Sequence, residues 1–232
     1  RLRDFFGLTG ARSDLVRMTG PTGQGVANFV PLYTYMPYSV RFENPSDATS
    51  AVKQVRILQA LDETLDERSF ILGDIVLGDI RVSMPATLGS FSGDFDFIEE
   101  RGIVLRVTAG VDVVSRTAFW TLTALDPETG LPPEDDALGV LLPNTDRAQF
   151  GTVSYFIRSW PEYTLGVDLQ TGVTIDASAR VIFDDATPMD TNIHRATLDA
   201  AAPVTRTTVR DLGGGSYRVT FTASDDAAGS GV

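Results

Sequence analysis

The segment Val173-Thr174-Ile175-Asp176-Ala177-Ser178-Ala179-Arg180-Val181-Ile182-Phe183 decides the fold class of this chain. Every second residue from Val173 to Phe183 is apolar, and the residues between them are mostly polar. A period of two is typical of a β-strand with one face in the core and the other in water. The segment therefore predicts one long half-buried strand in a β-rich fold.

The same alternation recurs in shorter stretches, at residues 38–43, 55–57, 80–84, 91–97, 103–108 and 153–157. Turn-forming residues such as Asn44-Pro45-Ser46-Asp47 separate these stretches. The stretch Phe119–Ala124 is apolar on both faces, which fits a central strand, although a short buried helix shares that pattern. No long amphipathic helix is evident. We predict an all-β, antiparallel β-sandwich of the Ig-like type, with a closed barrel as the alternative.

Glycine, proline and alanine divide the chain into four parts. Residues 1–35 are rich in glycine and are predicted to be irregular, with a short helix near Ser13–Met18. Residues 36–197 form the sandwich domain, and residues 198–203 read as a linker. Residues 204–232 are predicted to begin a second, truncated Ig-like module with a hairpin around Gly213–Gly215. About 30 residues are too few for an independent core, so we expect the chain to be a segment of a longer modular protein.

The composition narrows the classes of partner. The formal net charge is −12 and the sequence pI is about 4.4, so nucleic acid and anionic membrane surfaces would be repelled. Cysteine is absent, which excludes disulfides, thiolate zinc sites and thiol nucleophiles. No stretch approaches the roughly 20 apolar residues of a membrane helix. Cations fit the acidic balance better, although the charge can serve solubility alone.

An acidic, proline- and glycine-punctuated loop is the first candidate metal site. Its carboxylates are those of Asp126, Glu128, Glu134, Asp135 and Asp136. Such a loop can fold back and direct several oxygen ligands to one Ca²⁺ ion, which takes six to eight of them. The spacing does not match an EF-hand, and a solvated acidic loop is the alternative reading.

A second candidate metal cluster lies shortly before the predicted linker. It consists of Asp184, Asp185 and Asp190. Carboxylates at a junction between modules could bind Ca²⁺ and stiffen the joint, because a bridging ion removes the freedom of two modules to swing. The alternative is an ordinary turn after a strand.

Other candidate chemistry is sparse. Trp160 and Tyr163 could form an exposed platform for a sugar or a protein, or a small satellite of the core. His194 is the single histidine, and no G-x-S-x-G motif accompanies it. Asp94 and Asp96 lie on the solvent face of one predicted strand, with no pocket to make them a glycosidase pair. We therefore predict that the chain is not an enzyme.

The motifs at both ends of the predicted sandwich resemble a known module. Tyr38-Ser39-Val40-Arg41-Phe42-Glu43-Asn44, the later Leu65-Asp66-Glu67-Arg68-Ser69-Phe70, and Ile175–Phe183 are similar to the opening strand, corner and closing strand of an uncharacterised Ig-like β-sandwich repeat of very large bacterial surface proteins. The resemblance covers residues 37–192. The middle section, 89–144, is missing from shorter members, and Asp176 replaces their usual asparagine.

This resemblance implies export to the cell surface or the medium and a tandem arrangement with other modules. We accordingly expect a structural or adhesive module that is stabilised by calcium and contacts the neighbouring modules of its own polypeptide, a surface glycan or a protein. A carbohydrate-binding module that accompanies a secreted hydrolase, with Trp160 and Tyr163 as its platform, is the alternative function.

Overall fold

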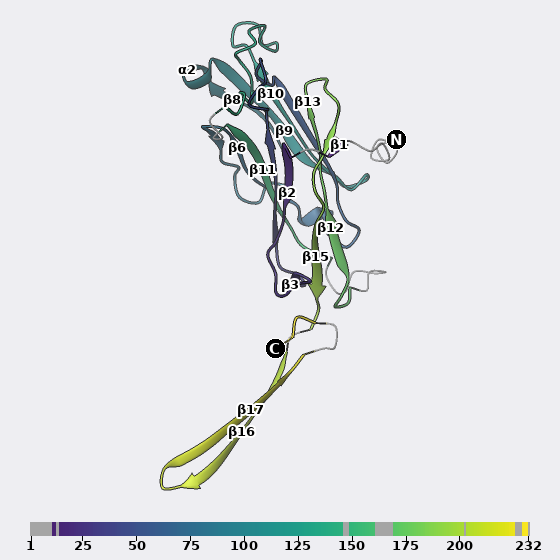
Figure 1. Cartoon of the computed structure of the whole chain (residues 1–232), viewed down its shortest axis with the longest axis vertical. Coiled ribbons are helices and arrows are strands. Elements are labelled where there is room, and N and C mark those ends of the chain that lie inside the picture. Colours follow the sequence, from purple (N-terminus) through teal and green to yellow (C-terminus); the bar gives the residue numbers. More distant parts are fainter. Residues whose placement is uncertain are drawn as a thin grey trace.

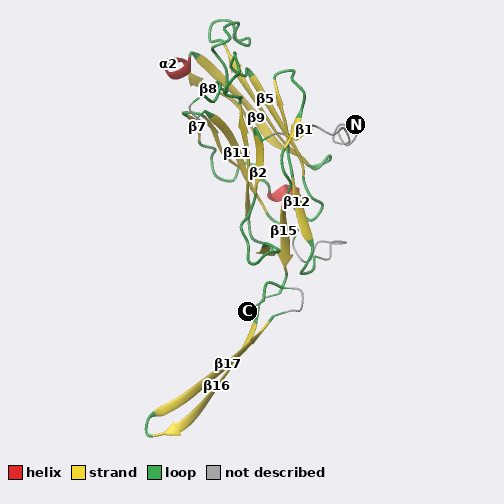
Figure 2. Ribbon diagram, in the orientation of Figure 1, coloured by secondary structure: helices red, strands yellow, loops and turns green. Residues whose placement is uncertain are grey.

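The computed structural model describes residues 11–12, 14–145, 149–160, 169–201, 203–225 and 229–231. These residues form an all-β fold in which two sheets face one another and a long hairpin extends beyond them (Figures 1 and 2). The all-β sandwich predicted from the sequence is therefore confirmed. Tyr163 lies outside the described residues.

The two facing sheets supply most of the strands. The larger sheet has the order β1 (Ala11–Arg12), β14 (Met189–Asp190), β13 (Arg180–Phe183), β5 (Gln54–Ala60), β10 (Thr117–Leu125), β9 (Ile103–Asp112) and β8 (Phe91–Phe97). The smaller sheet has the order β2 (Val16–Thr19), β4 (Met36–Glu43), β11 (Phe150–Ile157), β6 (Ile71–Leu77) and β7 (Ile80–Val82). Apart from the parallel pair β1 and β14, these strands are antiparallel.

Smaller elements complete the fold. A third sheet has the order β12 (Thr174–Ala177), β15 (His194–Asp199) and β3 (Phe29–Pro31), and the hairpin consists of β16 (Val204–Gly213) and β17 (Ser216–Ser224). The helical elements among the described residues are the single 3₁₀ turn η1 (Glu67–Ser69) and the short α2 (Ile98–Arg101).

The core lies between the two large sheets. The Trp120 ring of β10 packs against the Tyr155 ring of β11, with ring centroids 5.7 Å apart, and both side chains are fully buried. Phe42 of β4 meets Phe183 of β13 at 6.3 Å in the same way. The apolar stretch around Trp120 is the central strand predicted from its two-sided pattern, because β10 pairs with β5 on one side and β9 on the other.

The segment Val173–Phe183 buries most of its apolar row as predicted, but it is not one strand, and Arg180 of the predicted water-facing row is also buried. Ile175, Ala177, Ala179, Val181 and Phe183 are all buried. The chain leaves the third sheet after Ala177 and enters the larger sheet at Arg180. At the break, Ala179 donates to the Thr191 hydroxyl at 2.9 Å and its carbonyl accepts from the Thr191 amide at 3.0 Å. These bonds take the place of the strand-to-strand hydrogen bonds at the break. The apolar residues on either side of it therefore belong to two different sheets.

The N-terminal segment differs from its prediction. The helix expected near Ser13–Met18 is wrong, because Val16–Thr19 is strand β2, which pairs with β4. Its residues alternate between buried and exposed, so a strand buries Val16 and Met18 together where a helix would separate them. Strand β3 also comes from the segment predicted to be irregular. Both strands belong to sheets of the main fold.

The predicted linker begins later than expected. Leu198 and Asp199 belong to strand β15, and Leu198 is fully buried. The hairpin predicted after the linker is present as β16 and β17, with positive φ angles at Gly213, Gly214 and Gly215 in its turn. Every residue of β16 is exposed.

Candidate functional site

The acidic loop after β10 uses two of its five predicted carboxylates, those of Asp126 and Asp135, to shape its own turns. Asp126 accepts hydrogen bonds from the backbone N–H groups of Glu128 and Thr129 at 2.9 and 2.8 Å. These bonds hold the pKa of Asp126 below its ordinary value. Asp135 accepts the N–H of Ala137 at 2.8 Å. Glu128 and Glu134 are exposed. Asp126 and Asp135 of the first predicted cluster therefore cap turns, whereas the other members do not.

The second predicted cluster is divided between two structural roles. Asp190 forms a bidentate ion pair with the buried Arg180, at 2.7 and 2.8 Å, and this pair raises the pKa of Arg180. Asp184 accepts the backbone N–H groups of Lys53 and Gln54 at 3.0 and 2.7 Å. Asp185 is fully exposed, 3.9 Å from the guanidinium of Arg56.

Tertiary structure brings one member of each predicted cluster to the single lysine. The Lys53 ammonium lies 3.2 Å from Asp136, while its backbone N–H donates to Asp184. In the described part of the chain, no group of three or more His, Cys, Asp or Glu side chains lies close enough together to hold a metal ion. Calcium at either cluster stays a prediction.

Trp160 follows β11 and belongs to a corner where the segment after β5 meets Arg116, just before β10. Its indole N–H donates to the carbonyl of Glu63 at 3.1 Å, and its ring lies 5.9 Å from the Arg116 guanidinium. Arg116 also donates to the Leu65 carbonyl and forms an ion pair with the buried Glu67. The Trp160 ring is partly buried. This packing matches the satellite-core reading of Trp160, and its use as a sugar platform stays a prediction.

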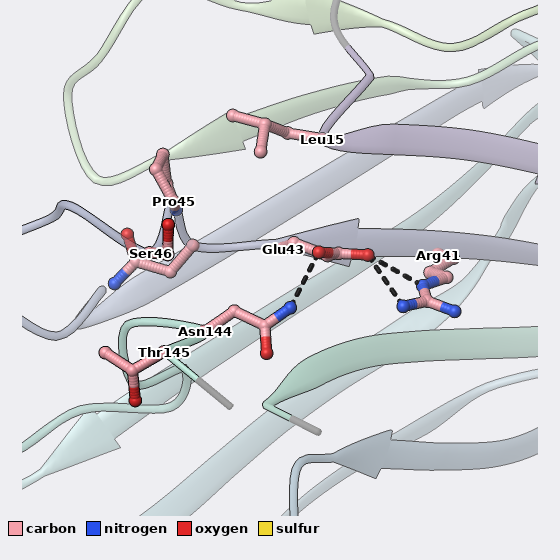
Figure 3. Close-up of a pocket in the computed structure, with 8 residues that line it drawn as sticks. Leu15, Arg41, Glu43, Pro45, Ser46, Asn144 and Thr145 are labelled. Carbon is pink, nitrogen blue, oxygen red and sulfur yellow. Dashed lines mark hydrogen bonds and ion pairs between the residues drawn. The ribbon is translucent and has the colours of Figure 1, made fainter. Parts of the chain in front are cut away.

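A polar pocket lies where β4 leaves the smaller sheet (Figure 3). Glu43 accepts hydrogen bonds from Arg41 at 3.0 Å and from the Asn144 side-chain amide at 2.7 Å, as the dashed lines in Figure 3 show. The Arg41 guanidinium stacks 4.0 Å from the Phe150 ring centroid. The polar groups of this pocket bind one another, and in doing so they tie the end of the long loop to β4.

A shallow groove of about 600 Å³ crosses the outer face of the smaller sheet. Its apolar lining includes Ile71, Val76 and the exposed Phe156, and its polar rim includes the ion pair of Asp74 and Arg81 at 2.7 Å. A Cβ atom at Gly73 would lie 2.5 Å from the Ser154 hydroxyl, so the glycine permits the bulge between β6 and β11. The groove presents apolar surface without a convergent set of catalytic groups.

His194 lies partly inside the fold. Its ring meets Tyr38 edge-on at 6.2 Å, and its Nε2 is buried without a hydrogen-bond partner. Burial lowers the pKa of His194 below 6.5. Gly20 fits tightly against this ring, because a Cβ there would lie 2.3 Å from it. Sequence analysis missed this contact because Gly20 and His194 are far apart in the chain.

The hairpin carries an uncovered apolar face. The register pairs Val209 with Val219 and Thr207 with Phe221, so these side chains share one face with Tyr217. Val209, Val219 and Phe221 are 61%, 59% and 75% exposed. The opposite face carries Arg206, Arg210 and Arg218. An apolar stripe on an otherwise polar two-stranded sheet is the arrangement of a strand pair that packs on another β structure.

Comparison with known proteins identifies no family for this chain. No protein-family model and no curated protein matches the sequence. Among solved structures, the chain is similar to the collagen-binding domain of a Staphylococcus aureus adhesin, at 12% identity over 81% of this chain and 99% of that chain, with a TM-score of 0.38.

Two pilin structures are also similar. The C-terminal 35 kDa fragment of the Streptococcus agalactiae major pilin GBS80 matches at 14% identity over 84% of this chain and 58% of that chain, with a TM-score of 0.44. BcpA, the major pilin subunit of Bacillus cereus, matches at 12% identity over 82% and 43%, with a TM-score of 0.42. Across the described residues, no helix has the length and apolarity needed to cross a membrane.

Proposed function

We propose that this chain is a structural or adhesive β-sandwich module of an extracellular bacterial surface protein, and that its hairpin connects it to a neighbouring β unit. The observation that carries the proposal is the uncovered apolar face of β16 and β17, beyond one end of the sandwich (Figure 1). An isolated two-stranded hairpin is marginally stable in water, so this face needs a partner.

The sandwich supports a mechanical role better than a chemical one. Several of its acidic side chains cap turns or pair with arginines, as Asp94 does with Arg106 and Asp176 with Arg195. The two sheets share a continuous apolar core. A rigid unit of this kind can hold binding surfaces or other modules at fixed spacing. We accordingly propose a non-enzymatic role, and a broad hydrolase screen that detects turnover would contradict it.

The proposed location follows from the resemblance of the opening, corner and closing motifs to a repeat of bacterial surface proteins. The second, truncated Ig-like module, predicted to begin at residue 204 with this hairpin, stays a prediction. Calcium is not needed for the proposed role.

Protease treatment of intact producing cells tests the location. We expect trypsin to release peptides from residues 36–197 while a cytosolic marker protein stays uncut. A lysed-cell sample, in which both proteins are digested, is the control. Release of the module only after lysis would contradict an extracellular location.

A further inference from the structure

The outer edge of the larger sheet offers a second unfinished surface, at β8. This strand pairs with β9 on one side only. Its inward row, Phe91, Phe95 and Phe97, packs against the core but stays partly exposed, and the Phe91 and Phe95 rings stack at 5.4 Å. Its outward row holds the exposed Asp94 and Asp96. A strand added at this edge would complete the sheet and cover the phenylalanine row.

The hairpin matches this edge in pattern. Strand β17 spans nine residues and β8 spans seven, so one can pair along the whole of the other. Strand β17 alternates an apolar row, with Tyr217, Val219 and Phe221, against a polar row that includes Arg218. When its apolar row continues the phenylalanine row of β8, the polar row necessarily continues the aspartate row, because successive side chains point to opposite faces.

The charges of the two elements are complementary. Residues 204–224 contain three arginines and one aspartate, which gives the hairpin a formal charge of +2. The whole chain carries −12, so the remaining residues carry −14. Near the β8 edge, Asp96, Glu99 and Glu100 form no ion pair among the described residues. Edge carboxylates repel an acidic strand and attract a basic one, so this edge favours a basic partner strand.

The hairpin cannot reach the β8 edge of its own molecule. The hairpin extends beyond one end of the sandwich, whereas β8 and α2 lie near the other (Figure 1). We infer that β17 of one copy adds to the free edge of β8 in a second copy, so that copies associate head to tail. Such a contact uses two different surfaces and does not close on itself, so it extends into open chains. The inference rests on the proposed connecting role of the hairpin and names its partner.

Sedimentation velocity of the whole 232-residue chain tests this inference. We expect species larger than a dimer to grow with protein concentration and to decline as salt rises, because the attraction between exposed charges is screened. A chain that stays monomeric at all concentrations would overturn the inference. A dimer that grows no further would also overturn it, since that result indicates hairpins packed face to face.

Charge exchange then locates the contact. Arg218→Glu and Asp96→Arg each place like charges opposite one another, and each is expected to weaken association by about tenfold or more. The double variant restores opposite charges and is expected to return association to within about threefold of the original chain. Arg17→Glu, on the edge strand β2 of the smaller sheet, is the matched control and should leave association unchanged. Failure of the double variant to recover, with its thermal unfolding unchanged, would overturn the β17–β8 pairing.

These outcomes are separate from the test of the proposed function. A monomeric chain on the outside of the cell leaves the structural role in place and removes the second copy as the partner. A chain that self-associates but is found only inside the cell would remove the proposed extracellular role and leave the second copy as the partner.

Discussion

The side-chain amide of Gln59 donates a hydrogen bond of 2.6 Å to the Tyr155 hydroxyl, and this bond joins the two facing sheets inside the core. Gln59 belongs to β5 of the larger sheet and Tyr155 to β11 of the smaller one. Both side chains are buried, and burial raises the pKa of Tyr155 well above its ordinary value, so the hydroxyl stays protonated. A polar bond in this position fixes how the two apolar faces align.

Tyr155→Phe should destabilise the fold by about 1–3 kcal/mol, because the Gln59 amide loses its acceptor in a place that water does not reach. Urea unfolding followed by tryptophan fluorescence measures the change. Tyr217→Phe, on the exposed hairpin, removes the same atom and should change the unfolding free energy by less than about 0.5 kcal/mol. Equal effects of the two variants would show that the Gln59 bond contributes nothing.

Asp184→Ala should cost about 1–3 kcal/mol, because two backbone N–H groups, of Lys53 and Gln54, lose their acceptor. Asp184 also has φ 47°, a conformation that aspartate and asparagine tolerate better than alanine does. Asp184→Asn keeps an acceptor and should recover much of the loss. The neighbouring Asp185→Ala is the control, and a cost similar to that of Asp184→Ala would contradict the capping role.

The stability of the fold should fall as the pH is lowered from about 7 to 5, because of His194. Burial holds the pKa of its imidazole below 6.5, so the unfolded chain binds this proton more readily than the folded chain. The stability present above pH 6.5 is therefore lost as the pH falls through the lower, folded-state value. Urea unfolding at several pH values measures the slope.

His194→Gln should flatten this slope, since the chain has no other histidine. The hydrogen bond that Asp176 accepts from Arg195 lowers the pKa of this carboxyl. Carboxylates of this kind add a separate loss of folding stability as the pH falls below 3.8. An unchanged slope between about pH 7 and 5 in the variant would assign the effect to another group.

If the carboxylates of the two predicted calcium clusters keep their present partners, added calcium should leave the thermal midpoint unchanged. Asp126 and Asp135 already bind backbone N–H groups, Asp136 pairs with Lys53, and Asp190 pairs with Arg180. A cation would have to displace these donors. Melting curves with about 1 mM CaCl₂ and with a chelator test this, because an ion specific to the folded state raises its stability. A midpoint that rises with calcium and loses its rise in Asp126→Asn would support the predicted loop site instead.

The local pattern of apolar and polar residues was enough to predict the class of fold. Alternation around Val153 and around Val40 predicted buried and exposed faces correctly, because a period of two has the same meaning wherever a strand lies. In Val173–Phe183 it predicted the buried apolar row, but Arg180 of the opposite row is buried as well. The two-sided apolar stretch at Trp120 likewise predicted a central strand. The Gly213–Gly215 turn predicted the hairpin, because three consecutive positive φ angles suit glycine best.

Tertiary structure alone decided which sheet each strand joins and which charges meet. Residues 173–183 alternate without interruption, yet bonds between Ala179 and Thr191 divide them between two sheets. Asp136 and Asp184 were predicted to serve separate metal clusters, and both contact Lys53. Such pairings join residues more than 80 positions apart, and side-chain periodicity reports only which way a residue faces, not which distant residue it meets.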